Sequence, residues 1–489
     1  MRPTSPGERL SVDDERLSCL DTAFLRLESA GAPMHLGALA VFAPRRPIAA
    51  ARLVKVLTER LARIPSLRQR IRTTWLPPGG AAWTPDKTFD LNRHLHLHKL
   101  DQDAEAMTLM AGELMAEPLD LSRPLWQVHL LTGLPEGRFA VLIKLHHAMA
   151  DGLRTVELGL RLLDGFADRQ PGQPDQGLAV PAFAVPFIPP IALPAAERAT
   201  RTARAITELA QGAMQLPRAL AQASSTMGIA ASVLSHARLA ALPSLLTKGN
   251  GAHRDPVAPT DQPAAARRLV LARLDTHDIR QVRKRHGGTE HDVLLAVITG
   301  ALQHWALANG RSPQALTVRA FIPVSHRSHR AEPRRRNVLS GYLCDLPIHH
   351  DRPVSVLHDI RAAMDRNKAA GFARGPGAFP VLADRMPAAA QHLTIPLLRR
   401  AGPLLFDTTI TSVPIPSRPM TFAGGQLQHV YPIAPLAHGQ ELAIAVSTYR
   451  DSVHIGLHAD HHAVPDLERV ADAIPAALAT LNDSTAPAR

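Results

Sequence analysis

Cysteine is nearly absent from this sequence of 489 residues, which contains only Cys19 and Cys344. Two thiols so far apart exclude a disulfide framework and a four-thiolate zinc site, and they favour a reducing, intracellular compartment. The 25 histidines are scattered, and the adjacent His349 and His350 with Asp351 do not match a recognised zinc-ligand spacing. We therefore expect no metal.

Long apolar runs are also missing. The best candidate, residues 181–196, is interrupted by internal prolines, so it is a poor transmembrane helix. The polar residues 1–9 lack the apolar core of a signal peptide. These absences predict a cytoplasmic protein without a transmembrane span, and secretion is not expected.

Aromatic residues make up only 4% of the chain, although the formal net charge is +12. With few rings to stack on bases, no zinc-finger spacing and no helix-turn-helix signal, the charge does not indicate nucleic-acid binding. The basic runs at residues 280–286 and 334–336 are therefore either solvated faces or sites that attract phosphate groups or an anionic membrane.

The length and an ordinary globular composition, with 45% hydrophobic residues, predict two domains or two halves around a shared interface. The pattern of apolar residues indicates mixed α and β structure, which places the chain in the α/β class. Residues 1–168 combine predicted helices and strands. Residues 169–266 are rich in proline and alanine and predict a helical crossover. Alternation of apolar and polar residues then resumes, so residues 267–489 are the second predicted domain. Within the crossover, residues 195–246 interleave apolar and arginine side chains, which is typical of a helical bridge or of an amphipathic element on a lipid surface.

Hydrophobic periodicity predicts individual elements in both domains. Helices are expected at residues 50–63, 103–116, 292–308 and 465–481. A hairpin is expected from residues 441–448 and 452–458, which flank Arg450 and Asp451.

A pair of histidines stands where a predicted strand meets a predicted helix. Residues 139–145 form a short apolar run, as expected for a strand covered on both faces. The segment His146-His147-Ala148-Met149-Ala150-Asp151-Gly152 follows, and apolar residues then recur at helical spacing. Asp151 is a good N-cap for that helix, so the motif occupies a strand-to-helix turn.

The two histidines differ in predicted role because consecutive side chains on a strand point to opposite faces. We expect His147 to enter a cleft, where an imidazole suits a general base acting on a hydroxyl group. Asp151 would fix the turn or hold the imidazole indirectly, and Gly152 would permit a backbone geometry that other residues resist. The alternative is purely structural: Asp151 caps a helix and His146 is a satisfied interior histidine.

The same spacing recurs in residues 461–466, but there Leu467 replaces the final glycine. Pro465 stands beside an expected helix start. We predict a solvated loop in this segment, with Asp466 as a capping residue and without a catalytic role.

The segment from His146 to Gly152 resembles the active-site signature of the superfamily of CoA-dependent acyltransferases and peptide-synthetase condensation domains. Within it, the rest of the chain is similar to the bacterial wax ester synthase/diacylglycerol acyltransferase family. The matching text of the first domain lies in residues 17–21, 33–37, 65–70, 118–120 and 123–126. In the second domain it lies in residues 292–297, 323–325, 336–337, 346–347, 413–414 and 465–466.

The resemblance implies two chloramphenicol-acetyltransferase-like halves, each a mixed sheet with flanking helices, with a tunnel between them. It implies that His147, with His146, Asp151 and Gly152, accepts the proton of a hydroxyl group that attacks an acyl-CoA thioester. No cofactor is implied, because acyl-CoA is a co-substrate. The acceptor would be diacylglycerol, a long-chain alcohol or both, at a membrane or lipid-droplet surface. The weaker substrate-binding candidates are Trp126, Asn337 and Ser412.

Two segments depart from the family pattern and bear on the substrate range. His291 replaces the usual asparagine before Asp292, and residues 411–416 have Thr-Ser-Val-Pro-Ile-Pro in place of Ser-Asn-Val-Pro-Gly-Pro. A catalytically silent lipid-binding protein and a condensation-type acyltransferase with another nucleophile are the alternatives. No residue identifies itself as a donor to an oxyanion.

Overall fold

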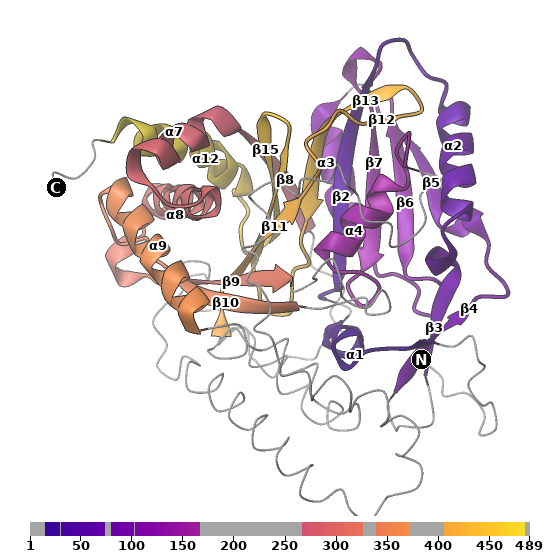
Figure 1. Cartoon of the computed structure of the whole chain (residues 1–489), viewed down its shortest axis with the longest axis horizontal. Helices are drawn as coiled ribbons and strands as arrows, with labels where there is room; N and C mark the ends of the chain where they lie inside the picture. Colours follow the sequence, from indigo (N-terminus) through magenta and orange to yellow (C-terminus); the bar gives the residue numbers. More distant parts are fainter. Residues whose placement is uncertain are drawn as a thin grey trace, which may run out of the picture.

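The computed structural model describes residues 15–29, 31–73, 80–101, 103–166, 267–325, 339–370 and 405–484. Two six-stranded mixed sheets with flanking helices lie side by side, one for each half of the chain (Figure 1). The predicted α/β class is therefore confirmed. The predicted crossover, residues 169–266, lies outside the described residues, so the domain boundaries on either side of it stay a prediction.

The N-terminal sheet is built around two long strands that pair antiparallel, with His35 opposite His146. Its strands, in spatial order, are β12 (Thr421–Phe422), β13 (Gly425–Ile433), β2 (His35–Pro44), β7 (Phe139–His146), β6 (Trp126–Thr132) and β5 (Leu95–Lys99). Every residue of β7 is buried, which confirms the strand predicted from its continuous apolar run.

Helices cover both faces of this sheet. On one face lies α3 (Ala104–Ala116), whose Met115 belongs to the same buried cluster as Leu142 of β7. On the other face lie α2 (Ala50–Ala62) and α4 (Gly152–Leu160). α2 and α3 confirm the predicted helices to within one residue at each end. The half also contains α1 (Cys19–Leu27) and a small sheet of β1 (Glu15–Arg16), β4 (Ala81–Pro85) and β3 (Gln69–Thr73).

In the C-terminal half, the sheet and its helices pack around one hydrophobic core. Its strands, in spatial order, are β10 (Leu339–Leu346), β9 (Val318–Ser325), β11 (Thr408–Pro414), β14 (Leu442–Tyr449), β15 (Ser452–Asp460) and β8 (Arg267–Asp275). The helices are α7 (Thr276–His286), α8 (Glu290–Ala308), α9 (Pro353–Ala370) and α12 (Leu467–Asp483). β14 and β15 form the predicted hairpin, in which Arg450 takes a φ of 55° at the turn. α8 and α12 confirm the two helices predicted in this half.

β13 belongs to the C-terminal half by sequence but pairs with β2 of the N-terminal sheet. It keeps contact with its own half, because the Ser447 hydroxyl of β14 donates to the Val430 carbonyl at 2.6 Å. Where β13 crosses β15, a Cβ on Gly456 would lie 2.2 Å from the Pro432 carbonyl oxygen. Only glycine permits the two backbones to approach so closely. The sequence analysis did not predict this sharing of a strand.

Asp164, just beyond α4, fastens β12 to the N-terminal half. Its carboxylate accepts from Arg60 Nη2 of α2 at 2.5 Å and from the Thr421 hydroxyl at 2.7 Å. The backbone N–H groups of Ala423 and Gly424 donate to the same carboxylate. Burial by itself would raise the pKa of Asp164, but these hydrogen bonds outweigh it and lower the pKa. The carboxylate is therefore charged near neutral pH and ties three elements together.

Candidate active site

Backbone hydrogen bonds fix the turn that follows β7. The His147 N–H donates to the Met34 carbonyl at 2.8 Å, and the Met149 N–H donates to the His146 carbonyl at 2.8 Å. The Ala148 N–H donates to Nδ1 of His146 at 3.0 Å. The chain leaves the strand in a defined conformation, so each imidazole has a fixed direction.

Asp151 begins α4, which confirms its predicted role as an N-cap. Its Oδ1 accepts from the Arg154 N–H at 2.8 Å, and its carbonyl accepts from the N–H and the hydroxyl of Thr155, each at 2.9 Å. The side chain is buried. Asp151 therefore anchors the helix to the turn that carries His147.

Gly152 does not supply the unusual backbone geometry that the sequence predicted. It is the first residue of α4, and it is not among the glycines with positive φ. A Cβ at this position would lie 3.7 Å from Cγ2 of Val413 in β11. Gly152 thus lies where α4 packs against the C-terminal half.

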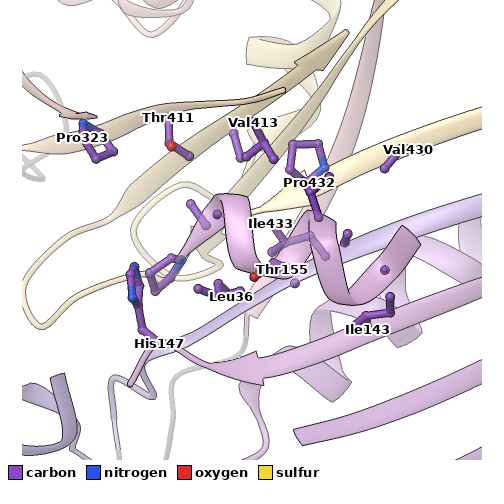
Figure 2. Close-up of a pocket in the computed structure, with 18 of the residues that line it drawn as sticks. Leu36, Ile143, His147, Thr155, Pro323, Thr411, Val413, Val430, Pro432 and Ile433 are labelled. Atoms are coloured by element: carbon purple, nitrogen blue, oxygen red, sulfur yellow. The ribbon is translucent and has the colours of Figure 1, made fainter. Parts of the chain in front are cut away.

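A largely apolar cavity of about 260 Å³ has His147 in its wall. Figure 2 shows that both halves of the chain contribute to the lining, with Leu36 and Thr155 from one half and Thr411 and Val413 from the other. The walls are formed mainly by α1, β2, β7 and α4 of the N-terminal half and by β11 and β13 of the C-terminal half. The cavity therefore exists only when both halves are present.

The His147 imidazole stacks on Phe24 of α1, with the ring centroids 4.0 Å apart and the planes inclined by 19°. Burial lowers the pKa of His147 to about 4, a hydrogen bond to its own backbone opposes this shift, and the neighbouring His146 adds to it. The ring is therefore neutral near pH 7. A neutral imidazole can accept a proton, as a general base must.

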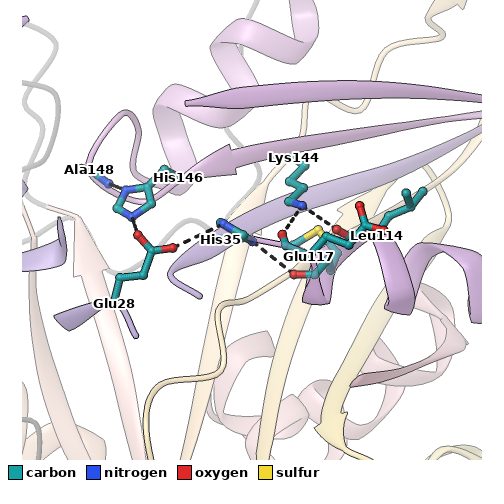
Figure 3. Close-up of polar contacts among 8 residues, drawn as sticks. Glu28, His35, Leu114, Glu117, Lys144, His146 and Ala148 are labelled. Carbon is teal, nitrogen blue, oxygen red and sulfur yellow. Dashed lines mark hydrogen bonds and ion pairs between the residues drawn. The ribbon is translucent and has the colours of Figure 1, made fainter. Parts of the chain in front are cut away.

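His146 is not part of the cavity wall, as the alternation along the strand predicted. Its side chain is fully buried, and its Nε2 donates to Oε2 of Glu28 at 3.0 Å while its Nδ1 accepts from Ala148 (Figure 3). These two partners place the proton on Nε2. Glu28 directly follows α1, so it links the helix that carries Phe24 to the histidine turn.

Further polar contacts lie near Glu28, at His35 of β2 and Lys144 of β7 (Figure 3). Nε2 of His35 on β2 lies 3.7 Å from Oε1 of Glu28. Lys144 is fully buried and donates to the carbonyls of Leu114 and Glu117, each at 2.6 Å. Burial lowers the pKa of Lys144 to about 8, although Glu117 and Glu28 oppose the shift. A cation is favoured at the C-terminal end of α3, so Lys144 holds that helix against β7.

Trp126, one of the weaker substrate-binding candidates, lies in the core and not in the cavity wall. Its Nε1–H donates to the Leu67 carbonyl at 2.7 Å. This contact gives Trp126 a structural role in the N-terminal half. A second candidate, Asn337, lies outside the described residues.

Ser412, the third candidate, lies behind the cavity wall. Its neighbours on β11, Thr411 and Val413, line the cavity, whereas the Ser412 hydroxyl lies 3.2 Å from Nδ1 of His291 at the start of α8. Both residues are departures from the family pattern noted in the sequence. The two departures therefore contact each other, at the place where α8 meets β11.

The second His-His segment, residues 461–466, forms the connection between β15 and α12, and His462 is exposed. Asp466 stands at the N-cap position of α12 but makes no capping hydrogen bond. Its carboxylate instead accepts from Trp305 Nε1 at 3.0 Å and from the Asn309 amide at 3.1 Å. The predicted capping role of Asp466 is therefore wrong. In the part of the chain that the structure describes, no three His, Cys, Asp or Glu side chains are arranged to hold a metal ion.

Comparison with known proteins gives matches along almost the whole chain. Residues 17–294 match the wax ester synthase/diacylglycerol acyltransferase catalytic domain, and residues 336–482 match the C-terminal domain of the same proteins. A probable diacylglycerol O-acyltransferase of Mycobacterium tuberculosis is 30% identical over 475 residues, which are 95% of this chain and 95% of that protein. Another of that species is 28% identical over 92% of this chain and 95% of its own length.

Solved structures with the same arrangement of two halves cover the chain equally well. The wax ester synthase/diacylglycerol acyltransferase from Marinobacter aquaeolei VT8 has a TM-score of 0.64 at 22% identity, with 95% of this chain and 98% of that chain covered. The starter condensation domain of rhizomide synthetase, solved with C8-CoA, has a TM-score of 0.54 at 14% identity, with 97% and 96% covered. These likenesses confirm the predicted two-half fold.

Proposed function

The chain belongs to the wax ester synthase/diacylglycerol acyltransferase family and is an acyltransferase, and we propose that it transfers the acyl group of acyl-CoA to the hydroxyl group of diacylglycerol, of a long-chain alcohol or of both. The names of the mycobacterial relatives support diacylglycerol as an acceptor. The observation that carries the proposal is a neutral imidazole, His147, in the wall of an apolar cavity. Both proposed substrates bring long hydrocarbon chains that such a cavity would bury.

His147 acts as the general base in the proposed mechanism. It accepts the proton of the acceptor hydroxyl while the oxygen attacks the thioester carbonyl, and the C–S bond then breaks. The imidazolium passes the proton to the departing CoA thiolate, so free CoA leaves and His147 is neutral again. An imidazolium is costly in apolar surroundings, which favours rapid return of this proton. Stacking on Phe24 and the hydrogen-bonded turn hold the ring in place during both transfers.

Product formation tests the proposed reaction directly. Purified protein is incubated with radiolabelled palmitoyl-CoA and either dioleoylglycerol or hexadecanol, and neutral lipids are separated and counted. We expect labelled triacylglycerol, wax ester or both. Absence of an ester product with either acceptor, from protein that remains folded, would contradict the proposal and favour a silent lipid-binding protein.

The low pKa of His147 predicts an unusual pH dependence. A free histidine has a pKa of about 6.5, whereas that of His147 is lowered to about 4, so the proton-accepting form persists as the pH falls. We expect kcat/KM to be level from about pH 8 to about pH 5 and to decline only near the pKa of the base. The measurement is kcat/KM at each pH, with near-UV circular dichroism to follow folding. A half-maximal rate near pH 6.5 in folded protein would show that the base is not shifted in this way.

We also propose that the protein works at the cytoplasmic face of a membrane or at a lipid-droplet surface, because diacylglycerol resides in lipid. Within the described ranges, no helix is both long and apolar enough to cross a bilayer. The net charge of +12 favours anionic surfaces. The protein should float with vesicles that contain phosphatidylglycerol and dissociate when salt is raised. Equal recovery with neutral vesicles would argue against a role for the charge.

A further inference from the structure

The cavity has an arm that runs beneath α4, along the surface of β2. Alternate residues of a strand face the same side, and four successive members of one face of β2 line the cavity. They are Leu36, Ala38, Ala40 and Phe42. Val141 and Ile143 of the neighbouring β7 line it as well. The arm therefore follows the sheet away from His147.

Small residues create the space in this arm. Ala38 and Ala40 stand between Leu36 and Phe42 on the floor, and Gly159 of α4 lines the arm from the helix side. A Cβ on Gly159 would lie 3.6 Å from Cδ1 of Ile143, which is ordinary van der Waals contact. A longer side chain at position 159 would therefore extend into the arm.

Aromatic rings and an ion pair lie at the far end of the arm. Phe42 stacks on Phe139 with the ring centroids 5.2 Å apart and lies 5.6 Å from the ring of Phe422. The Arg60 guanidinium lies 5.2 Å from the Phe422 centroid and is held by Asp164. The lining residues of the arm thus extend along β2 from Leu36 as far as Phe42, beside Phe422.

The length of the channel matches a fatty acyl chain. From Leu36 to Phe42 the strand advances about 20 Å, at about 3.3 Å per residue. An extended hydrocarbon chain zigzags, so that each C–C bond of about 1.5 Å advances the chain by only about 1.25 Å, and about 16 carbons cover that distance. An apolar arm of this length suits one unbranched hydrocarbon chain.

The rest of the cavity is more polar and lies between the two halves. Thr409, Thr411, His438 and Gln440 line it there, and the Gln440 amide donates to the Thr409 hydroxyl at 3.2 Å. This part offers hydrogen-bonding groups to an acceptor such as diacylglycerol, which carries ester groups as well as two hydrocarbon chains. The two parts meet at the wall that contains His147.

We propose that the arm beneath α4 holds the acyl chain of the donor thioester, and that Gly159 and Ala40 are specificity-determining residues that set the longest chain accepted. This inference rests on the proposed acyl transfer. It assigns the two substrates to different parts of the cavity, with donor length read by α4 and by the sheet that contains β2, β7 and β12.

The test is the donor chain-length profile of Gly159→Leu. Leucine is a better helix former than glycine, so α4 should persist, and thermal melting checks this. The ratio of kcat/KM for palmitoyl-CoA to that for octanoyl-CoA should fall about tenfold or more, because even one methylene group in a filled pocket changes this quantity measurably. The ratio does not depend on the fraction of active protein. Ala51→Leu, an exposed position on α2, is the matched control and should keep the wild-type ratio.

Acceptor profiles and direct binding complete the test. With one donor, the preference of Gly159→Leu among decanol, hexadecanol and diacylglycerol should equal that of the wild type. A shifted acceptor preference with an unchanged donor ratio would overturn the assignment of the arm. Calorimetric titration with palmitoyl-CoA and octanoyl-CoA gives a second readout that needs no turnover. If the wild type forms no ester yet Gly159→Leu loses palmitoyl-CoA binding selectively, the proposed reaction fails while the acyl channel stands.

Discussion

Replacing His147 with alanine should lower kcat by about 10² to 10⁴ while the fold is retained, because a positioned general base contributes this much to proton transfer. The backbone N–H of residue 147 would still donate to the Met34 carbonyl, and the Ala148 N–H would still donate to Nδ1 of His146. The main loss is the imidazole that stacks on Phe24 in the cavity wall. The comparison is made with saturating acyl-CoA and acceptor, so that kcat is measured separately from KM.

The chain offers its own matched control for this variant. His462 belongs to a segment with the same His-His spacing, but it is exposed between β15 and α12. His462→Ala should have wild-type kcat. An equal loss of activity in both variants, or unchanged ester formation by His147→Ala, would remove His147 from the role of base.

Replacing Glu28 with alanine should lower kcat by roughly tenfold or more and should also destabilise the protein. The variant leaves the buried Nε2–H of His146 without its acceptor at 3.0 Å, and an unsatisfied buried group costs about 1–3 kcal/mol. The tautomer of His146 is then no longer fixed. Because its Nδ1 accepts from the Ala148 N–H, a change of tautomer would disturb the turn next to His147.

Glu28→Gln separates the hydrogen bond from the charge. A glutamine oxygen can accept from His146, and the amide can donate toward Nε2 of His35, which lies 3.7 Å from the present carboxylate. We therefore expect Glu28→Gln to recover most of the activity and stability lost in Glu28→Ala. Urea denaturation and kcat are measured on both variants. If Gln is as inactive as Ala, the negative charge is the property that matters and the positioning argument fails.

The parts of the site that follow from local sequence were predictable. The continuous apolar run of residues 139–145 predicted a strand covered on both faces, and every residue of this strand is indeed buried. Asp151 starts α4 because a carboxylate can accept from the free N–H groups of the first turn. The opposite directions of His146 and His147 follow from the alternation of a strand.

The parts that depend on distant residues were not predictable from one sequence. Glu28 and His146 are 118 positions apart, and no local pattern says that they meet. Phe24 stands three residues after matching family text but carries no pattern that predicts stacking on His147. For the same reason, Gly152 received a conformational role, whereas the structure places it where α4 packs against Val413.

The pairing of β13 with β2 also limits where the chain can be cut into fragments. β2 lies between β13 and β7 in the N-terminal sheet, although β13 is encoded almost 400 residues after β2 begins. A fragment that ends before β13 would leave β2 as an uncovered edge whose neighbouring positions are largely apolar, a known template for aggregation. During synthesis the N-terminal sheet can therefore be completed only after the last quarter of the chain has been made, and until then β2 remains an unpaired edge.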